Sequence, residues 1–136
     1  MVLLDTHIWL WWLLEDGGLK KKERLSLNHL AKNRSLCVSW ATLWETEILE
    51  RKGRISLLPD FSAWIQKATQ KEIVQVLPVD LDVILTQRNL PDSFQSDPAD
   101  RLITATAILS GFELATFDHR IIEAEVCKIW NPASNF

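Results

Sequence analysis

Four acidic residues are placed along the chain so that their side chains could hold a divalent metal ion. Asp5 and Asp118 each directly follow a short apolar segment that is predicted to be a strand. Asp100 lies in the first turn of a predicted helix, and Glu45 lies near the apolar stripe of another. Carboxylates that lie close together repel one another unless a cation neutralises them, and Mg²⁺ and Mn²⁺ prefer oxygen ligands. Such an ion can make hydroxide from bound water and offset charge on a phosphoryl oxygen, so the set predicts metal-assisted phosphoryl chemistry.

Asp5 and Asp118 also have an ordinary structural explanation when each is considered alone. An aspartate after a strand is usually a turn residue or a helix cap. Asp5 could cap the helix that begins at Thr6, and Asp118 could cap a turn at His119. Their shared position at strand ends favours a common site, because ligands bind beyond the carboxyl ends of parallel strands.

Asp100 is distinguished from a neighbouring aspartate by its place in a helix. Pro98 suits the first helical position, which makes Asp97 the natural N-cap. With the cap filled, the helix dipole does not require Asp100, which is left as a ligand candidate. A single helical glutamate is usually a surface residue, so Glu45 joins the set only alongside the other acids.

Short apolar segments alternate with amphipathic ones along the chain. The predicted strands are Val2–Leu4, Leu36–Val38, Val74–Val79, Glu113–Phe117 and Lys128–Trp130. The predicted helices are Thr6–Glu15, Lys20–Asn33, Trp40–Lys52, Phe61–Lys71, Leu81–Asn89 and Pro98–Ser110, with a loop over Leu90–Ser96. Strands that alternate with helices predict a parallel sheet covered on both faces. We therefore expect a three-layer α/β/α fold with a central, mostly parallel sheet of four to five strands.

Length and composition are those of an ordinary globular protein. The 136 residues fit one domain over 1–136, with 47% hydrophobic and 24% charged residues. The net charge of −3 argues against a broad basic surface for nucleic acid, but not against binding through a metal ion. The basic groups at Lys20–Arg24 and Arg51–Arg54 are either solvated helix ends or local contacts.

The cysteines and the apolar segments indicate a cytoplasmic protein. Cys37 and Cys127 lie among apolar or strand-like neighbours without metal-binding spacing, which favours two reduced thiols. The longest apolar stretch, Ile8–Leu14, is far shorter than the ~20 residues that span a bilayer. The N-terminus lacks the positive start of a signal peptide, so we expect no membrane association.

Seven tryptophans are many for this length, and three of them lie in the first predicted helix. Trp9, Trp11 and Trp12 cover much of that helix's circumference, which is typical of a helix buried all round or used at an interface. Core packing suits Trp9 or Trp12, and at least one of the three is expected to face a partner. Stacking on RNA bases is less favoured, and Trp130 is expected to pack at an edge.

Four segments together resemble the PIN-domain family, and within it the VapC-type toxin ribonucleases of bacterial toxin–antitoxin pairs. These segments occur in the family's order and span nearly the whole chain: Leu3–His7 with Trp11–Trp12, Ser39–Glu45, Asp97–Leu102 and Ala115–Asp118. Any one of these segments alone is weak evidence for the family, but four of them in the family's order are specific evidence.

The resemblance implies a metal-dependent endoribonuclease whose catalytic acids are Asp5, Glu45, Asp100 and Asp118. It implies one or two Mg²⁺ or Mn²⁺ ions held by Asp5, Asp100 and Asp118, with Glu45 binding a second ion or orienting water. The residues expected to support these acids are Thr6, Asp97 and Thr116. The family further implies an RNA substrate, a homodimer and a small antitoxin that wraps the toxin.

Two other interpretations stay open at this point. The first is a catalytically silent binding module of the same fold, although such a module would not need the complete acidic set. The second is a phosphoryl-transfer domain in which Asp5 is the nucleophile. His7 stands where the dehalogenase pattern has a second aspartate, which disfavours that class.

Overall fold

A computed structural model describes residues 1–92, 94 and 97–132, and within these residues four strands form one sheet. The strands are β1 (Val2–Leu4), β2 (Leu36–Ser39), β3 (Gln75–Leu77) and β4 (Glu113–Ala115). Their order is β3-β2-β1-β4, and every neighbouring pair is parallel. Because β1 is central, Leu3 pairs with Cys37 on one side and with Leu114 on the other. The predicted parallel sheet is confirmed.

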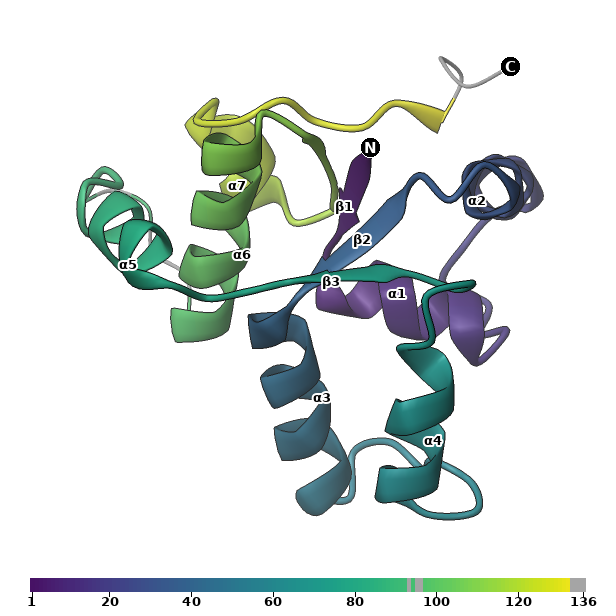
Figure 1. The fold of residues 1–136 in the computed structure, drawn as a ribbon. Helices are drawn as coiled ribbons and strands as arrows, with labels where there is room; N and C mark the ends of the chain where they lie inside the picture. Colours follow the sequence, from purple (N-terminus) through teal and green to yellow (C-terminus); the bar gives the residue numbers. More distant parts are fainter. Residues whose placement is uncertain (93, 95–96, 133–136) are drawn as a thin grey trace.

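Helices cover both faces of this sheet (Figure 1). Their bounds are α1 (Thr6–Leu13), α2 (Lys21–Lys32), α3 (Trp40–Arg51), α4 (Phe61–Ala68), α5 (Leu81–Arg88), α6 (Pro98–Ser110) and α7 (His119–Ala124). Successive side chains of a strand point to opposite faces, and the core is divided accordingly. Val2 and Leu4 pack with α1, α2 and α4, whereas Leu3 packs with α6 and α7. These two apolar clusters give the expected three layers.

The predicted fifth strand over Lys128–Trp130 is wrong. Within the described residues this segment makes a single parallel bridge, between Ile129 and Leu114. The Leu114 N–H donates to Lys128 O (2.8 Å) and the Trp130 N–H donates to Leu114 O (2.9 Å), and the pairing extends no further. Trp130 is nevertheless buried, so it contributes to packing as expected for an edge.

The strand before Asp118 is also shorter than predicted, because it ends at Ala115 rather than Phe117. The Ala115 carbonyl accepts a hydrogen bond from the Asp5 N–H (2.9 Å), after which the chain turns away from the sheet. The α7 helix that follows was not predicted, and Asp118 caps it by accepting from the Arg120 N–H.

Most other element bounds differ from the prediction only at their ends. The strand expected over Val74–Val79 is shorter, ending before Pro78, which has no N–H to donate. The α6 helix spans the predicted residues, with the Asp97 cap at its start and Gly111 at φ 72° after its end. In the loop predicted over Leu90–Ser96, residues 93, 95 and 96 lie outside the described residues.

The three tryptophans of α1 have three different environments. Trp9 is completely buried, and its ring meets that of Trp64 edge to face. Trp12 is half-buried and donates from Nε1 to Asn28. Trp11 is also half-buried, but its ring lines a pocket at the carboxyl end of the sheet. No helix among the described residues is long and apolar enough to cross a membrane.

The turn between α1 and α2 fixes the position of Trp11. The Arg24 guanidinium donates to the carbonyl oxygens of Trp11, Trp12 and Asp16, each at 3.0 Å. Gly18 lies directly against the indole, since a Cβ built on it would approach Trp11 Cδ2 to 2.4 Å. Only a residue without a side chain fits between the turn and this ring.

Replacement of Gly18 by alanine is therefore expected to force the Trp11 ring out of place. We expect Gly18→Ala to lower the free energy of unfolding by roughly 1–3 kcal/mol, as overpacking usually does. Gly17→Ala is the matched control, because a Cβ there meets nothing within 4 Å. Urea denaturation followed by circular dichroism measures both, and equal stabilities of the two variants would refute the contact.

Candidate active site

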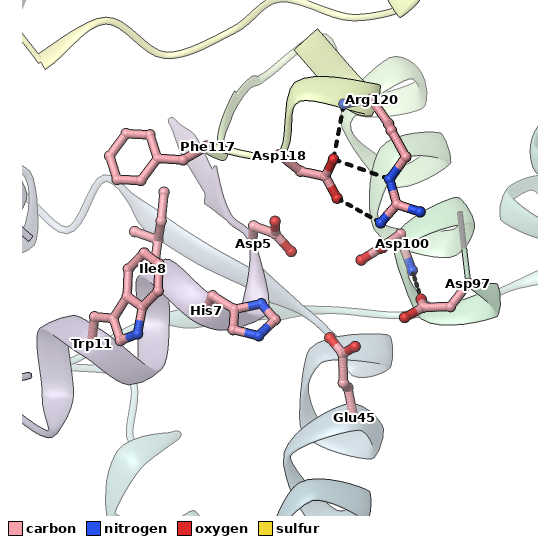
Figure 2. A pocket seen from close by; sticks show the side chains of 10 residues that line it. All are labelled: Asp5, His7, Ile8, Trp11, Glu45, Asp97, Asp100, Phe117, Asp118 and Arg120. Atoms are coloured by element: carbon pink, nitrogen blue, oxygen red, sulfur yellow. Dashed lines mark hydrogen bonds and ion pairs between the residues drawn. The ribbon is translucent and has the colours of Figure 1, made fainter. Parts of the chain in front are cut away.

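Asp5 is held by two hydrogen bonds at the carboxyl end of β1. Its Oδ1 accepts from the Thr6 N–H (2.8 Å), and its Oδ2 accepts from the Thr116 hydroxyl (2.8 Å). The residue is 6% exposed, and this burial raises the pKa of its carboxyl, although the two hydrogen bonds oppose the rise. Asp5 is therefore the N-cap of α1, which is its structural role. Its carboxylate also lines the pocket shown in Figure 2.

Asp97 and Asp100 lie differently at the start of α6, and the predicted Asp97 cap is confirmed. Asp97 Oδ1 accepts from the Asp100 N–H (2.9 Å) and so caps α6. Asp100 is 9% exposed in the first turn and lines the pocket. Burial raises the pKa of Asp100 to about 8, and the negative charges of Asp5 and Asp97 add to the rise.

Glu45 projects into the same pocket from α3, which begins where β2 ends. Ser39 caps this helix by accepting from the Ala41 N–H (2.9 Å). Glu45 Oε1 is buried and has no hydrogen-bond partner within the described part of the chain. Burial raises the pKa of this carboxyl, the Thr6 side chain opposes the rise, and the nearby charges of Asp97 and Asp5 add to it. A buried carboxylate oxygen without a partner is costly unless a cation or water meets it.

Asp118 lies at the rim of the pocket and is paired with an arginine. Its Oδ2 lies 3.3 Å from Arg120 Nη2, in a pair whose side chains are 23% and 62% exposed respectively. Partial burial acts to raise the pKa of Asp118, but hydrogen bonds from Arg120 and its positive charge outweigh that effect and lower it. Asp118 is therefore the acid of this pocket that already has a cation beside it.

The structure brings three of the predicted acids to within the span of one ion. Ligand oxygens of Asp5, Glu45 and Asp100 all lie within 4.8 Å of one another. Asp118 lines the same pocket, of about 310 Å³, but is not part of this closest group. The residues fit a hard divalent cation, because the group is all oxygen, its members repel one another, and no other residue of the described ranges meets Glu45 Oε1. The geometry thus favours Glu45 more strongly than its sequence position did.

The two threonines expected to support the acids act differently. The Thr116 hydroxyl donates to Asp5 and accepts from the Asp118 N–H (3.1 Å), so it connects two of the acids. Thr6 supports Asp5 through its backbone N–H, while its hydroxyl donates to Thr42 in α3 (3.4 Å). Both threonines are buried.

Several pocket residues were not among the predicted site residues. They are His7, Ile8, Trp11, Phe117 and Arg120. His7 and Arg120 each stand two residues after a predicted acid, and this closeness in sequence could have identified them as pocket residues. The position of Phe117 beside Trp11 had no such signal, because it depends on how β4 and α1 pack.

The strand order, with its acidic pocket at the carboxyl end of β1, defines a PIN-like fold, and solved structures agree. The structure described as "Crystal Structure of FitAcB from Neisseria gonorrhoeae" matches this fold with a TM-score of 0.68 and 20% sequence identity. The match covers 98% of this chain and 99% of the other chain. "Structure of FitAB bound to IR36 DNA fragment" gives 0.63 at 21% identity, covering 97% and 95%. At such identities the likeness establishes the fold alone.

The chain belongs to the PIN domain family, whose model matches residues 2–126. Ribonuclease VapC22 of Mycobacterium tuberculosis is 36% identical over 120 residues, which cover 88% of each protein. The resemblance to VapC-type toxins that the four segments indicated is thereby confirmed.

The cost of ionising a buried carboxyl among other acids predicts a pH-dependent instability of the metal-free protein. The folded-state pKa of Asp100, about 8, lies above its ordinary value of 3.8, so ionisation costs stability progressively as pH rises between these values. We expect Asp100→Asn to raise the free energy of unfolding in EDTA by roughly 1–3 kcal/mol at pH 8 and by little at pH 4.

Asp82→Asn is the matched control for this measurement. Asp82 also lies in the first turn of a helix, but it is exposed and outside the pocket. Urea titrations of the three proteins at both pH values provide the comparison. A gain for Asp100→Asn that is the same at pH 4 and pH 8 would contradict this cost of ionising Asp100.

Proposed function

We propose that this protein is a metal-dependent endoribonuclease and the toxin component of a toxin–antitoxin pair. The observation that carries the proposal is the group of carboxylate oxygens from Asp5, Glu45 and Asp100 within 4.8 Å, in which Glu45 Oε1 is buried without a partner among the described residues. RNA as the substrate is supported by kinship with a protein named Ribonuclease VapC22. The proposed catalytic residues are Asp5, Glu45, Asp100 and Asp118.

Mg²⁺ or Mn²⁺ is the proposed cofactor, held by Asp5, Asp100 and Asp118 with Glu45 beside them. When bound, such an ion lowers the pKa of water and offsets negative charge on a phosphate. The threonine hydrogen bonds hold Asp5 in place, and Asp97 holds the first turn of α6 that carries Asp100.

Hydrolysis by this site joins a water oxygen to phosphorus while the bond from phosphorus to the 3′ oxygen breaks. The products are a 5′-phosphate and a 3′-hydroxyl. Glu45 is suited to orient the water, because its unpartnered Oε1 can accept a hydrogen bond. Arg120, at the rim, is suited to approach a phosphate, since its side chain is largely exposed.

The other two candidate functions fit this geometry less well. A silent binding module has no use for a buried carboxylate oxygen such as Glu45 Oε1, which has no partner in the part of the chain that the structure describes. An aspartyl-phosphate on Asp5 would require one of its oxygens to attack, yet both already accept hydrogen bonds in a buried position. Metal-dependent hydrolysis needs the acids only as ligands, in the arrangement that they already have.

Loss of a ligand acid is expected to abolish RNA cleavage. We expect Asp5→Asn and Asp118→Asn to lower the rate by on the order of 100-fold or more, and EDTA to stop cleavage until Mg²⁺ or Mn²⁺ is added back. Cleavage of labelled RNA on denaturing gels measures this, with Asp82→Asn as the variant that stays active. Undiminished activity of the two ligand variants would overturn the site.

The proposed partners are a second copy of the chain and a small antitoxin, acting in the cytoplasm. A homodimer is supported by the exposed face of α5, where Leu81, Ile84 and Leu85 follow one another at helical spacing. Such an apolar stripe on a surface helix is typical of an interface. The free cysteines Cys37 and Cys127 agree with a reducing compartment.

A charge placed on the α5 stripe should separate the proposed dimer. We expect the wild-type protein to have the mass of two chains in solution and Leu85→Glu to have the mass of one, because a buried unpaired carboxylate opposes association. Leu58→Glu, at an exposed leucine outside α5, is the control. Light scattering after gel filtration gives the masses, and a Leu85→Glu dimer would place the interface elsewhere.

A further inference from the structure

One wall of the acidic pocket is aromatic and takes no part in the proposed metal binding. Its residues are His7, Trp11 and Phe117. The rings of Trp11 and Phe117 are nearly parallel, with centroids 6.4 Å apart and planes at 23°. The His7 ring lies 5.9 Å from Trp11 at 53°. Figure 2 shows Trp11 and Phe117 on the side of the pocket away from Arg120, with Asp5 between.

Trp11 is fixed in this wall before any ligand arrives. Gly18 packs against its indole, and Arg24 binds its carbonyl oxygen. Phe117, by contrast, is 37% exposed, whereas Trp9 of the same α1 helix is completely buried. A ring that only completed the core would resemble Trp9. The ordered Trp11 ring packs behind the exposed Phe117 ring. Because the rings are already in place, a flat ligand can stack on them at little entropic cost.

The negative charge of the pocket favours a contact with RNA that does not depend on cations. The acids lining the pocket are Asp5, Glu45, Asp97, Asp100 and Asp118, against one arginine among its described residues, Arg120. The protein as a whole carries a net charge of −3. Phosphates next to the cleaved one therefore gain little from the protein's field. Stacking of a base on an aromatic ring supplies affinity without a charge, and it needs an unpaired nucleotide.

We propose that Phe117, supported by Trp11, is a stacking platform for one base of single-stranded RNA beside the phosphate that is cleaved. The platform would hold the neighbouring base so that the adjacent phosphate lies at the carboxylates, and Phe117 is therefore a substrate-binding residue. The inference rests on the proposed ribonuclease function.

The test separates base stacking from every other effect of the ring. Two probes are used, tetra-adenylate and a tetramer of the same ribose phosphates without bases, which carries the same charge. Calorimetry in the Asp100→Asn background measures their binding without cleavage. Phe117→Leu removes the ring at a half-exposed site and keeps an apolar side chain, and Phe117→Tyr restores a ring. Trp40→Leu removes an exposed aromatic of α3 that does not line the pocket.

We expect Phe117→Leu to weaken tetra-adenylate binding about tenfold, equivalent to about 1.4 kcal/mol, and to leave binding of the abasic tetramer unchanged. Phe117→Tyr should bind as the parent does, and Trp40→Leu likewise. Equal losses for both probes would overturn the proposal, and so would an absence of RNA binding. Unchanged affinities of Phe117→Leu for both probes would also overturn the proposal. The exposed rings would then be assigned to contact with another protein instead.

Failure of this inference and failure of the proposed function give different results. Cleavage by the wild-type protein is measured separately, with and without Mg²⁺. Metal-dependent cleavage without a base-dependent effect of Phe117 overturns the platform alone. A base-dependent effect without cleavage overturns the nuclease and keeps the platform.

Discussion

The cost of burying several carboxylates in one pocket, where their charges also repel one another, is the constraint on which the rest of the structure depends. Burial raises the pKa values of Asp5, Glu45 and Asp100, and their charges act on one another. The hydrogen bonds to Asp5 offset only part of this cost, so apolar packing on both faces of the sheet must supply the remainder. A divalent cation relieves the repulsion directly, so the arrangement that weakens the metal-free fold also gives it affinity for an ion.

The sheet topology turns this constraint into a defined geometry. Because β1 lies between β2 and β4, the end of β1 is fixed from two sides. The Asp5 N–H donates to Ala115 O, and the next residue of that strand end, Thr116, reaches Asp5 with its hydroxyl. The same hydroxyl accepts from the Asp118 N–H, so one threonine sets the relative positions of two acids far apart in sequence. A helix cap and a metal ligand are thus compatible roles for Asp5.

Strand periodicity and capping rules were enough to predict the parallel sheet, the α6 cap and the pocket positions of Asp5 and Asp100. Glu45 could be placed only by family resemblance, because its border position on α3 becomes a pocket position through packing against α6. The α7 helix and the Arg120 pair escaped prediction, since a short helix has little periodicity to detect. The aromatic wall was not predicted for another reason. The stacked rings of Trp11 and Phe117 lie far apart in the sequence, and no sequence pattern links them.

The acids of the pocket differ in how firmly they are held, and this difference bears on how a substrate enters. Asp5 and Asp100 are buried, with backbones fixed by strand pairing and a helix cap. Asp118 is held by Arg120 in an exposed pair, and such pairs contribute little stability. Separating them is therefore cheap. Under the proposed function, an arriving phosphate would pair with the guanidinium while Asp118 would turn to the proposed cation, so RNA and the ion would favour each other's binding at this rim.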